Sequence, residues 1–164
     1  MSKPSEYAAF MGIFTALTAV LSAADSMLSA SIPITGVRLG LANICIITVM
    51  MHCGSVSGGV LSLLRSGFVF ASRGVTAGIM SLCGGILSYA AALLLSRMHC
   101  SCKFFCAVSS ICHICGQLAV ACILTRSSHT LYYLPILIPA AIVTGLLTGT
   151  VSEMITKRMS QTKS

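Results

Sequence analysis

The chain has 164 residues, of which 56% are hydrophobic and 8% charged, and its mean hydropathy is +0.97. A soluble domain carries roughly 25% charged residues because its surface must be solvated, so this composition excludes an ordinary soluble domain. The 10 basic and 3 acidic residues give a formal net charge of +7. The basic residues stand singly between apolar blocks, which is typical of the ends of membrane helices and argues against a nucleic-acid partner.

Breaks at proline, glycine, histidine and charged residues divide the chain into six apolar blocks. A membrane span needs about 20 apolar residues, so six spans joined by short loops account for residues 1–164 as a single membrane domain. The predicted fold class is therefore an all-α membrane protein, a bundle of six transmembrane helices. The predicted spans are 7–28, 37–51, 56–71, 76–96, 104–124 and 131–155. The first block is too long for the core of a signal peptide, so we expect it to be retained as a span.

The orientation of the bundle follows from the loops that carry lysine and arginine. With the N-terminus inside, the cytoplasmic side holds Lys3, Arg97, Lys103, Lys157, Arg158 and Lys163. The opposite side holds Arg38, Arg73 and Arg126. Because cytoplasmic loops carry the excess of basic residues, both termini are predicted to be cytoplasmic.

Arg65 lies well inside the third predicted span, where a charged side chain is costly and marks a candidate functional site. Its forked donors suit a carboxylate or a phosphate. Asp25 is the one acidic residue between Glu6 and Glu153. Two interpretations remain open. Asp25 forms an ion pair with Arg65 or Arg38 that fixes the packing of the helices, or Arg65 faces a ligand.

Further polar residues are candidates for the same ligand site. Arg38 and Asn43 bracket the start of the second predicted span, although a snorkelling contact with lipid headgroups accounts equally well for Arg38. His113 and Gln117 are four residues apart in the fifth span, so they share one helix face. That face either binds a ligand or hydrogen-bonds a neighbouring helix.

Small residues recur at four-residue spacing in the first span, at Ala8, Gly12 and Ala16. This spacing lets another backbone approach closely. The stripe predicts either tight packing within the bundle or a docking face for a partner subunit.

Nine cysteines are present, and Cys100, Cys102 and Cys106 follow His99 in a basic hinge. No pair of CxxC elements on loops accompanies them, so we expect no metal site. No Walker-type phosphate loop is present, and no pair of acids could hold magnesium and a diphosphate. We therefore expect no cofactor and no catalytic activity of the chain's own.

Several motifs resemble, in order, those of one family. The segment 36–44, GVRLGLANI, looks like the "PGIKLGLANI" signature of the Gx transporter family, also labelled heptaprenyl diphosphate synthase component I. His113 with Gly116 and Gln117 resembles its "AHNIGQ" element, and the likeness runs from about residue 16 to 153. Asp25 stands where the family usually has Glu, and Arg38 where it has Lys. Ile114 replaces the Asn that follows the His.

The family is similar to the substrate-binding S components of energy-coupling-factor transporters, which are six-helix proteins of the bacterial cytoplasmic membrane. This resemblance implies capture of a small molecule and docking of a coupling subunit with ATPases through Ala8, Gly12 and Ala16. From Arg38, Arg73 and Arg126 on the outer side we expect an anionic molecule, and an isoprenoid-related one is the other option. Arg38, Asn43, Arg65, His113 and Gln117 would then line the substrate pocket, with Asp25 orienting an arginine. The alternative is a non-catalytic membrane component beside a prenyl diphosphate synthase subunit, and a structural scaffold is a third possibility.

Overall fold

The computed structural model describes residues 4–29, 40–97 and 101–161. Within these ranges the chain is built from helices and contains no β-strand. The elements are α1 (Pro4–Ser29), α2 (Asn43–Cys53), α3 (Ser55–Arg73), α4 (Val75–Ser96), α5 (Cys102–Thr125), a short 3-10 helix η1 (Ser128–Tyr133) and α6 (Leu134–Gln161). The predicted all-α membrane bundle is confirmed, and the chain is a multi-pass membrane protein.

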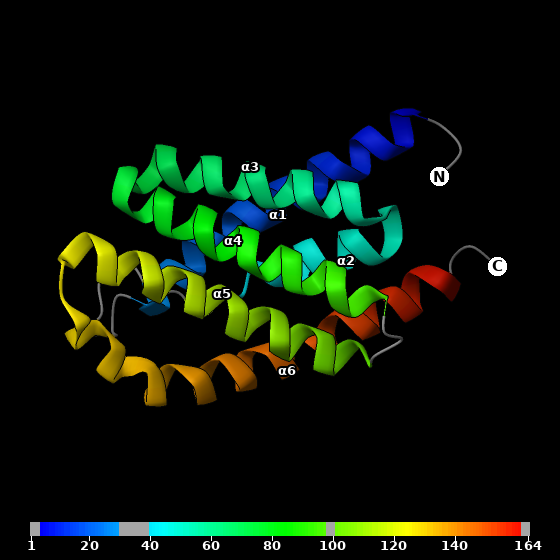
Figure 1. Ribbon diagram of the computed structural model, residues 1–164. Helices are drawn as coiled ribbons and strands as arrows, with labels where there is room; N and C mark the ends of the chain where they lie inside the picture. Colours follow the sequence, from blue (N-terminus) through cyan, green and yellow to red (C-terminus); the bar gives the residue numbers. More distant parts are fainter. Residues whose placement is uncertain (1–3, 30–39, 98–100, 162–164) are drawn as a thin grey trace.

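Single glycines make the two tightest connections between helices. Gly54 separates α2 from α3 with φ 91°, and Gly74 separates α3 from α4 with φ 85°. Residues with a Cβ avoid this left-handed region, whereas glycine adopts it readily. Each glycine therefore reverses the chain in a single residue, and successive helices run antiparallel (Figure 1).

The helices differ in their capacity to cross a membrane. Five of them, α1, α3, α4, α5 and α6, are long and apolar enough to do so, whereas α2 has 11 residues and is shorter. The second span was predicted at 37–51, but the helix begins only at Asn43. At 1.5 Å per residue it covers about 17 Å, roughly half of a bilayer core.

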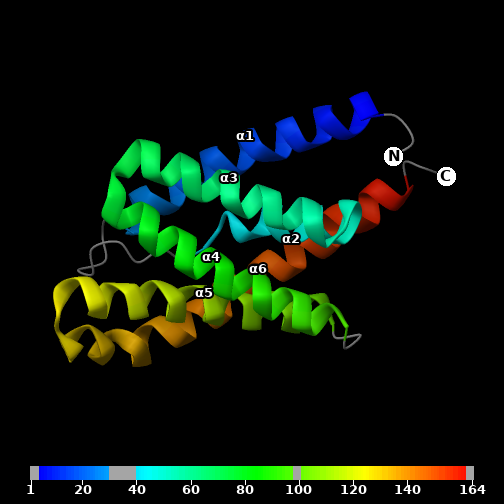
Figure 2. The same ribbon diagram turned by 45° about the horizontal axis from the view of Figure 1, so that its top comes forward.

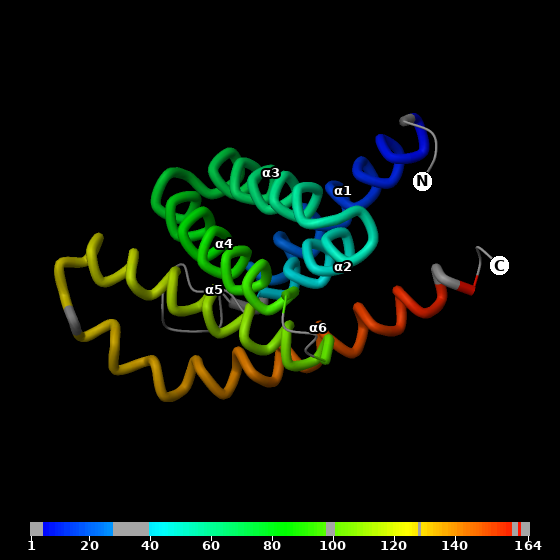
Figure 3. The backbone as a smooth tube through the Cα atoms, turned by 45° about the vertical axis from the view of Figure 1, so that its right-hand side comes forward, coloured from blue at the N-terminus to red at the C-terminus, as the bar shows by residue number. Residues whose placement is uncertain are grey.

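The short helix is enclosed by the long ones. The long helices follow one another around the bundle in the order α1, α3, α4, α5, α6, and α2 packs against α1, α3 and α6. Figure 3 shows α2 between these neighbours, and Figure 2 shows the first part of α6 beside α5, below α3 and α4. Every α2 residue from Cys45 to Met50 is buried, so this helix forms the centre of the bundle.

The interior combines hydrophobic clusters with many polar side chains, and the exterior is largely apolar, unlike that of a soluble protein. Buried positions include hydroxyl or amide side chains on each of the six α-helices, whereas large hydrophobic residues such as Ile13, Val56, Leu94 and Ile136 are more than 60% exposed. Lipid is the solvent that suits such an exterior. Polar side chains inside the bundle must then find partners among the helices.

Glycines bring α4, α5 and α6 into close contact. A Cβ added to Gly116 would lie 2.8 Å from the Cα of Gly84, and one added to Gly145 would lie 2.5 Å from the Cα of Ala107. The stripe on α1 is different. Ala8, Gly12 and Ala16 are exposed, and a Cβ on Gly12 would meet nothing within 4 Å. Tight packing within the bundle therefore does not account for this stripe.

Candidate functional site

The candidate site is centred on Arg65, half-way along α3, whose side chain is 2% exposed. Its Nη1 donates a hydrogen bond of 2.8 Å to Oδ1 of Asn43, the first residue of α2. Its Nη2 lies 4.0 Å from Oδ2 of Asp25, which is fully buried on α1. The guanidinium thus links three helices, and the predicted Asp25–Arg65 ion pair is present.

Gly40 lies between the Asp25–Arg65 ion pair and His113 on α5. Its backbone N–H donates a hydrogen bond of 3.0 Å to Oδ2 of Asp25. A Cβ placed on Gly40 would lie 3.4 Å from Nδ2 of Asn43 and 3.9 Å from Cδ2 of His113. With φ +84°, the residue occupies a conformation that favours glycine. Gly40 is thus the point where α1, the start of α2 and α5 meet.

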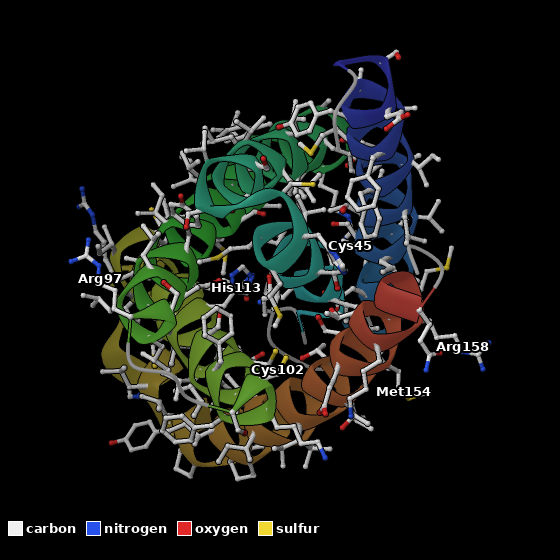
Figure 4. The ribbon with its side chains drawn as sticks, turned by 90° about the vertical axis from the view of Figure 1, so that its right-hand side faces the viewer. Cys45, Arg97, Cys102, His113, Met154 and Arg158 are labelled. Atoms are coloured by element: carbon white, nitrogen blue, oxygen red, sulfur yellow. The ribbon has the colours of Figure 1, made fainter. Side chains whose placement is uncertain are left out.

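His113 and Gln117 form the α5 side of the site. Both are fully buried, and Nε2 of His113 lies 3.1 Å from Nε2 of Gln117 in a hydrogen-bonded pair. Gly84 of α4 allows this packing, because a Cβ there would lie 2.8 Å from the carbonyl oxygen of His113. Figure 4, which looks along the bundle, shows His113 directed into the interior. The shared face predicted for this pair therefore faces inward.

The polar groups around Arg65 include more free donors than free acceptors. Within the described part of the chain, Nε and Nη2 of Arg65 and Nδ2 of Asn43 are buried without a hydrogen-bond acceptor. Asn43 also begins α2, and a helix N-terminus carries partial positive charge. The centre is thus suited to a group that brings acceptor oxygens.

The structure brings together five of the predicted residues: Asp25, Asn43, Arg65, His113 and Gln117. Arg38 lies outside the described residues. The sequence interpretation did not identify Gly40 as a junction, although Asn43, three residues later in the LGLAN segment (39–43), was a signal for a helix start. It also passed over Ser81 and Ser110, whose buried hydroxyls have no hydrogen-bond partner in the described ranges.

Two further predictions concern cysteines and ion pairs. Among the described residues, no three histidine, cysteine or acidic side chains gather as a metal-binding group. The other ion pair described is an exposed contact of 2.9 Å between Glu153 and Lys157, one turn apart on α6. The Asp25–Arg65 pair is therefore the buried one.

A comparison with protein families identifies the group to which this chain belongs. The family model described as heptaprenyl diphosphate synthase component I matches residues 14–155. The chain is a member of this family. The match includes every residue of the candidate site and the whole of α2 to α5. No curated protein and no solved structure matches the chain significantly.

Proposed function

We propose that this family member is a substrate-capture membrane subunit of a small-molecule uptake transporter. The observation that carries the proposal is the buried Arg65–Asn43 centre, part-way through the bundle, where the half-length helix α2 begins. Transporters bind substrates at such interrupted helices, near the middle of the membrane, because backbone and side-chain polar groups are available there. A purely structural centre would pair its donors more fully.

The chemistry of the site indicates the class of substrate. Asp25 balances part of the charge on Arg65 at 4.0 Å, but the free guanidinium and amide donors need acceptors. A carboxylate or phosphate would supply them. His113 and Gln117 would contact the same molecule from α5, and Arg38 would contribute a second positive charge.

The proposal extends to a partner. The exposed small-residue stripe of Ala8, Gly12 and Ala16 would receive a transmembrane coupling subunit, since its backbone is accessible along one face of α1. Energy would come from ATPases bound to that subunit. In this arrangement the chain needs no cofactor and carries out no chemical step of its own.

The test is native mass spectrometry of the protein purified in mild detergent. Wild type should retain a small molecule with acceptor oxygens, and Arg65→Ala should lose it while remaining folded, because the main donor is gone. The matched control is Arg73→Ala at the exposed end of the same helix, which should retain the ligand. Equal retention by wild type and Arg65→Ala would exclude Arg65 as a ligand-binding residue.

The family description favours a second candidate function. It names component I of a heptaprenyl diphosphate synthase, so this chain would be a membrane component beside a separate catalytic subunit. Prenyl elongation needs magnesium bound by carboxylates, and Asp25, the buried acid in the described ranges, is already engaged by Arg65 and Gly40. Co-purification with an aspartate-rich soluble synthase subunit would support this candidate, whereas co-purification with ATPases would support the transporter.

A further inference from the structure

Two cysteines and one methionine lie at the end of the bundle where α1 begins and α6 ends. Cys102, the first residue of α5, places its Sγ 3.7 Å from Sδ of Met51 on α2. Cys106, one turn further along α5, is fully buried, and Cys102 packs against the hydrophobic cluster to which Cys106 belongs. The group thus contains two thiols and one thioether, and it lies apart from the Arg65 centre.

The spacing fits a metal ion bound by sulfur. Metal–sulfur bonds of about 2.3 Å place the sulfurs of a trigonal or tetrahedral site roughly 3.8–4.0 Å apart. The Cys102–Met51 distance is 3.7 Å, so little movement is needed to admit an ion between them. Thioether and thiolate ligands together are soft and favour Cu⁺ over Zn²⁺, which prefers thiolate, imidazole and carboxylate.

The surroundings hold the ligands and leave a route to them. Cys102 also contacts the carbonyl oxygen of Gly149 on α6 at 3.8 Å, and a Cβ added to Gly149 would lie 3.3 Å from Cβ of Cys106. The hydroxyl of Ser152 on α6 lies 2.9 Å from the hydroxyl of Thr48 on α2. A cavity of about 250 Å³, lined in part by Met51 and Cys102, opens beside them. Figure 4 looks onto this end of the bundle and labels Cys102.

We propose that Cys102, Cys106 and Met51 form a binding site for a soft monovalent cation, Cu⁺. On binding, the two thiols release their protons to water and coordinate the ion as thiolates, with no change in oxidation state. The copper and its three sulfur ligands then carry one net negative charge. The N-terminus of α5 at Cys102 and the adjacent Lys103 offset that charge.

The test is titration of the full-length protein in detergent with Cu⁺, buffered by a competing chelator without oxygen, and with Ag⁺ as an analogue. Native mass spectrometry gives the stoichiometry and the competition gives the affinity. Wild type should bind a single ion. Cys102→Ser and Cys106→Ala should each weaken binding by about 100-fold or more, since even outer-shell changes cost 10–100-fold. Met51→Leu, which keeps the side-chain volume, should weaken it by about tenfold.

The control is Cys115→Ser, an exposed cysteine elsewhere on α5, which should bind like wild type. Unchanged affinity in Cys102→Ser would overturn the proposal, and so would an equal loss in Cys115→Ser or displacement of Cu⁺ by equimolar Zn²⁺. If Cys106→Ala fails to fold, the variants Cys102→Ser and Met51→Leu still test the proposal, because Cys102 is half-buried and Met51 is exposed. None of these residues contributes to the Arg65 centre, so neither result of the copper titration bears on the proposed transport function.

Discussion

Arg65 has two partners of different chemical character. Asn43 accepts a short hydrogen bond from it, whereas Asp25 stands 4.0 Å away and accepts its own hydrogen bond from the backbone of Gly40. Removing the charge of one member of a buried pair leaves the other uncompensated, which costs about 3–5 kcal/mol. The ion pair and a ligand role for Arg65 are therefore compatible, because the pair leaves donors of Arg65 unused.

Asp25→Asn should destabilise the protein by about 3–5 kcal/mol, because Arg65 then remains charged and buried without a counter-ion. The double variant Asp25→Asn/Arg65→Met should recover part of that loss, since both charges are gone. Chemical unfolding in detergent micelles measures both variants against Arg65→Met alone as a double-mutant cycle. Strictly additive effects would show that the two side chains do not interact.

Gly40→Ala should weaken substrate retention and lower thermal stability. The added Cβ has ordinary space near Asn43 and His113, but φ +84° is strained for alanine, at a cost of about 1–3 kcal/mol. Gly67→Ala is the control, because Gly67 is exposed on α3 and a Cβ there meets nothing within 4 Å. The melting temperature and the amount of ligand retained in native mass spectrometry should both be lower for Gly40→Ala than for Gly67→Ala. Equal values for the two variants would show that Gly40 is not part of the site.

At the scale of the elements, α4 and α5 depend on contact between glycines. Gly116→Val should destabilise the bundle by about 1–3 kcal/mol or more, because even the first added carbon would meet the Cα of Gly84 at 2.8 Å. Gly12→Val tests the same substitution where nothing lies within 4 Å, and it should leave the stability of the isolated chain unchanged. Comparison of apparent melting temperatures in one detergent distinguishes the two positions.

The same α1 substitution tests the docking face. In the presence of a coupling subunit, Gly12→Val should reduce co-purification, since the β-branched side chain keeps the partner backbone at a distance. Val20 is already a large exposed residue on α1, so Val20→Ile provides a conservative control on this helix. A complex recovered equally with wild type and Gly12→Val would place the interface elsewhere.

Hydropathy predicted the long helices well, because lipid-facing residues dominate their composition. It could not predict the start of α2, since the apolar residues Leu39, Leu41 and Ala42 continue the pattern up to Asn43. The helix begins where Gly40 adopts φ +84° and gives its N–H to Asp25, and that contact joins distant parts of the chain. Arg65 was recognisable from the sequence as a costly intramembrane charge and Asn43 as a candidate site residue, whereas the hydrogen bond between them emerged only from the fold.

At the scale of the whole molecule, the described basic residues other than Arg65 divide between the two ends of the bundle. α1 begins, α4 ends, α5 begins and α6 ends on one side, as Figure 1 shows. Arg97 and Arg158 on this side point away from the bundle in Figure 4. Arg73 and Arg126 belong to the opposite end, at the α3–α4 turn and the end of α5. The arrangement of the helices and the distribution of charge are thus consistent with the predicted topology.

That topology predicts that reporters at the two ends of the bundle behave oppositely in bacterial cells. GFP fused after Ser164 should fluoresce, because the excess of basic residues keeps this end in the cytoplasm. Alkaline phosphatase inserted after Arg126 should be active, because the α5–η1 connection then faces the periplasm. Exchanging the two reporters is the control and should silence both. An active phosphatase at Ser164 would invert the orientation and place the proposed Cu⁺ site at the outer face, leaving the bundle and its Arg65 centre unchanged.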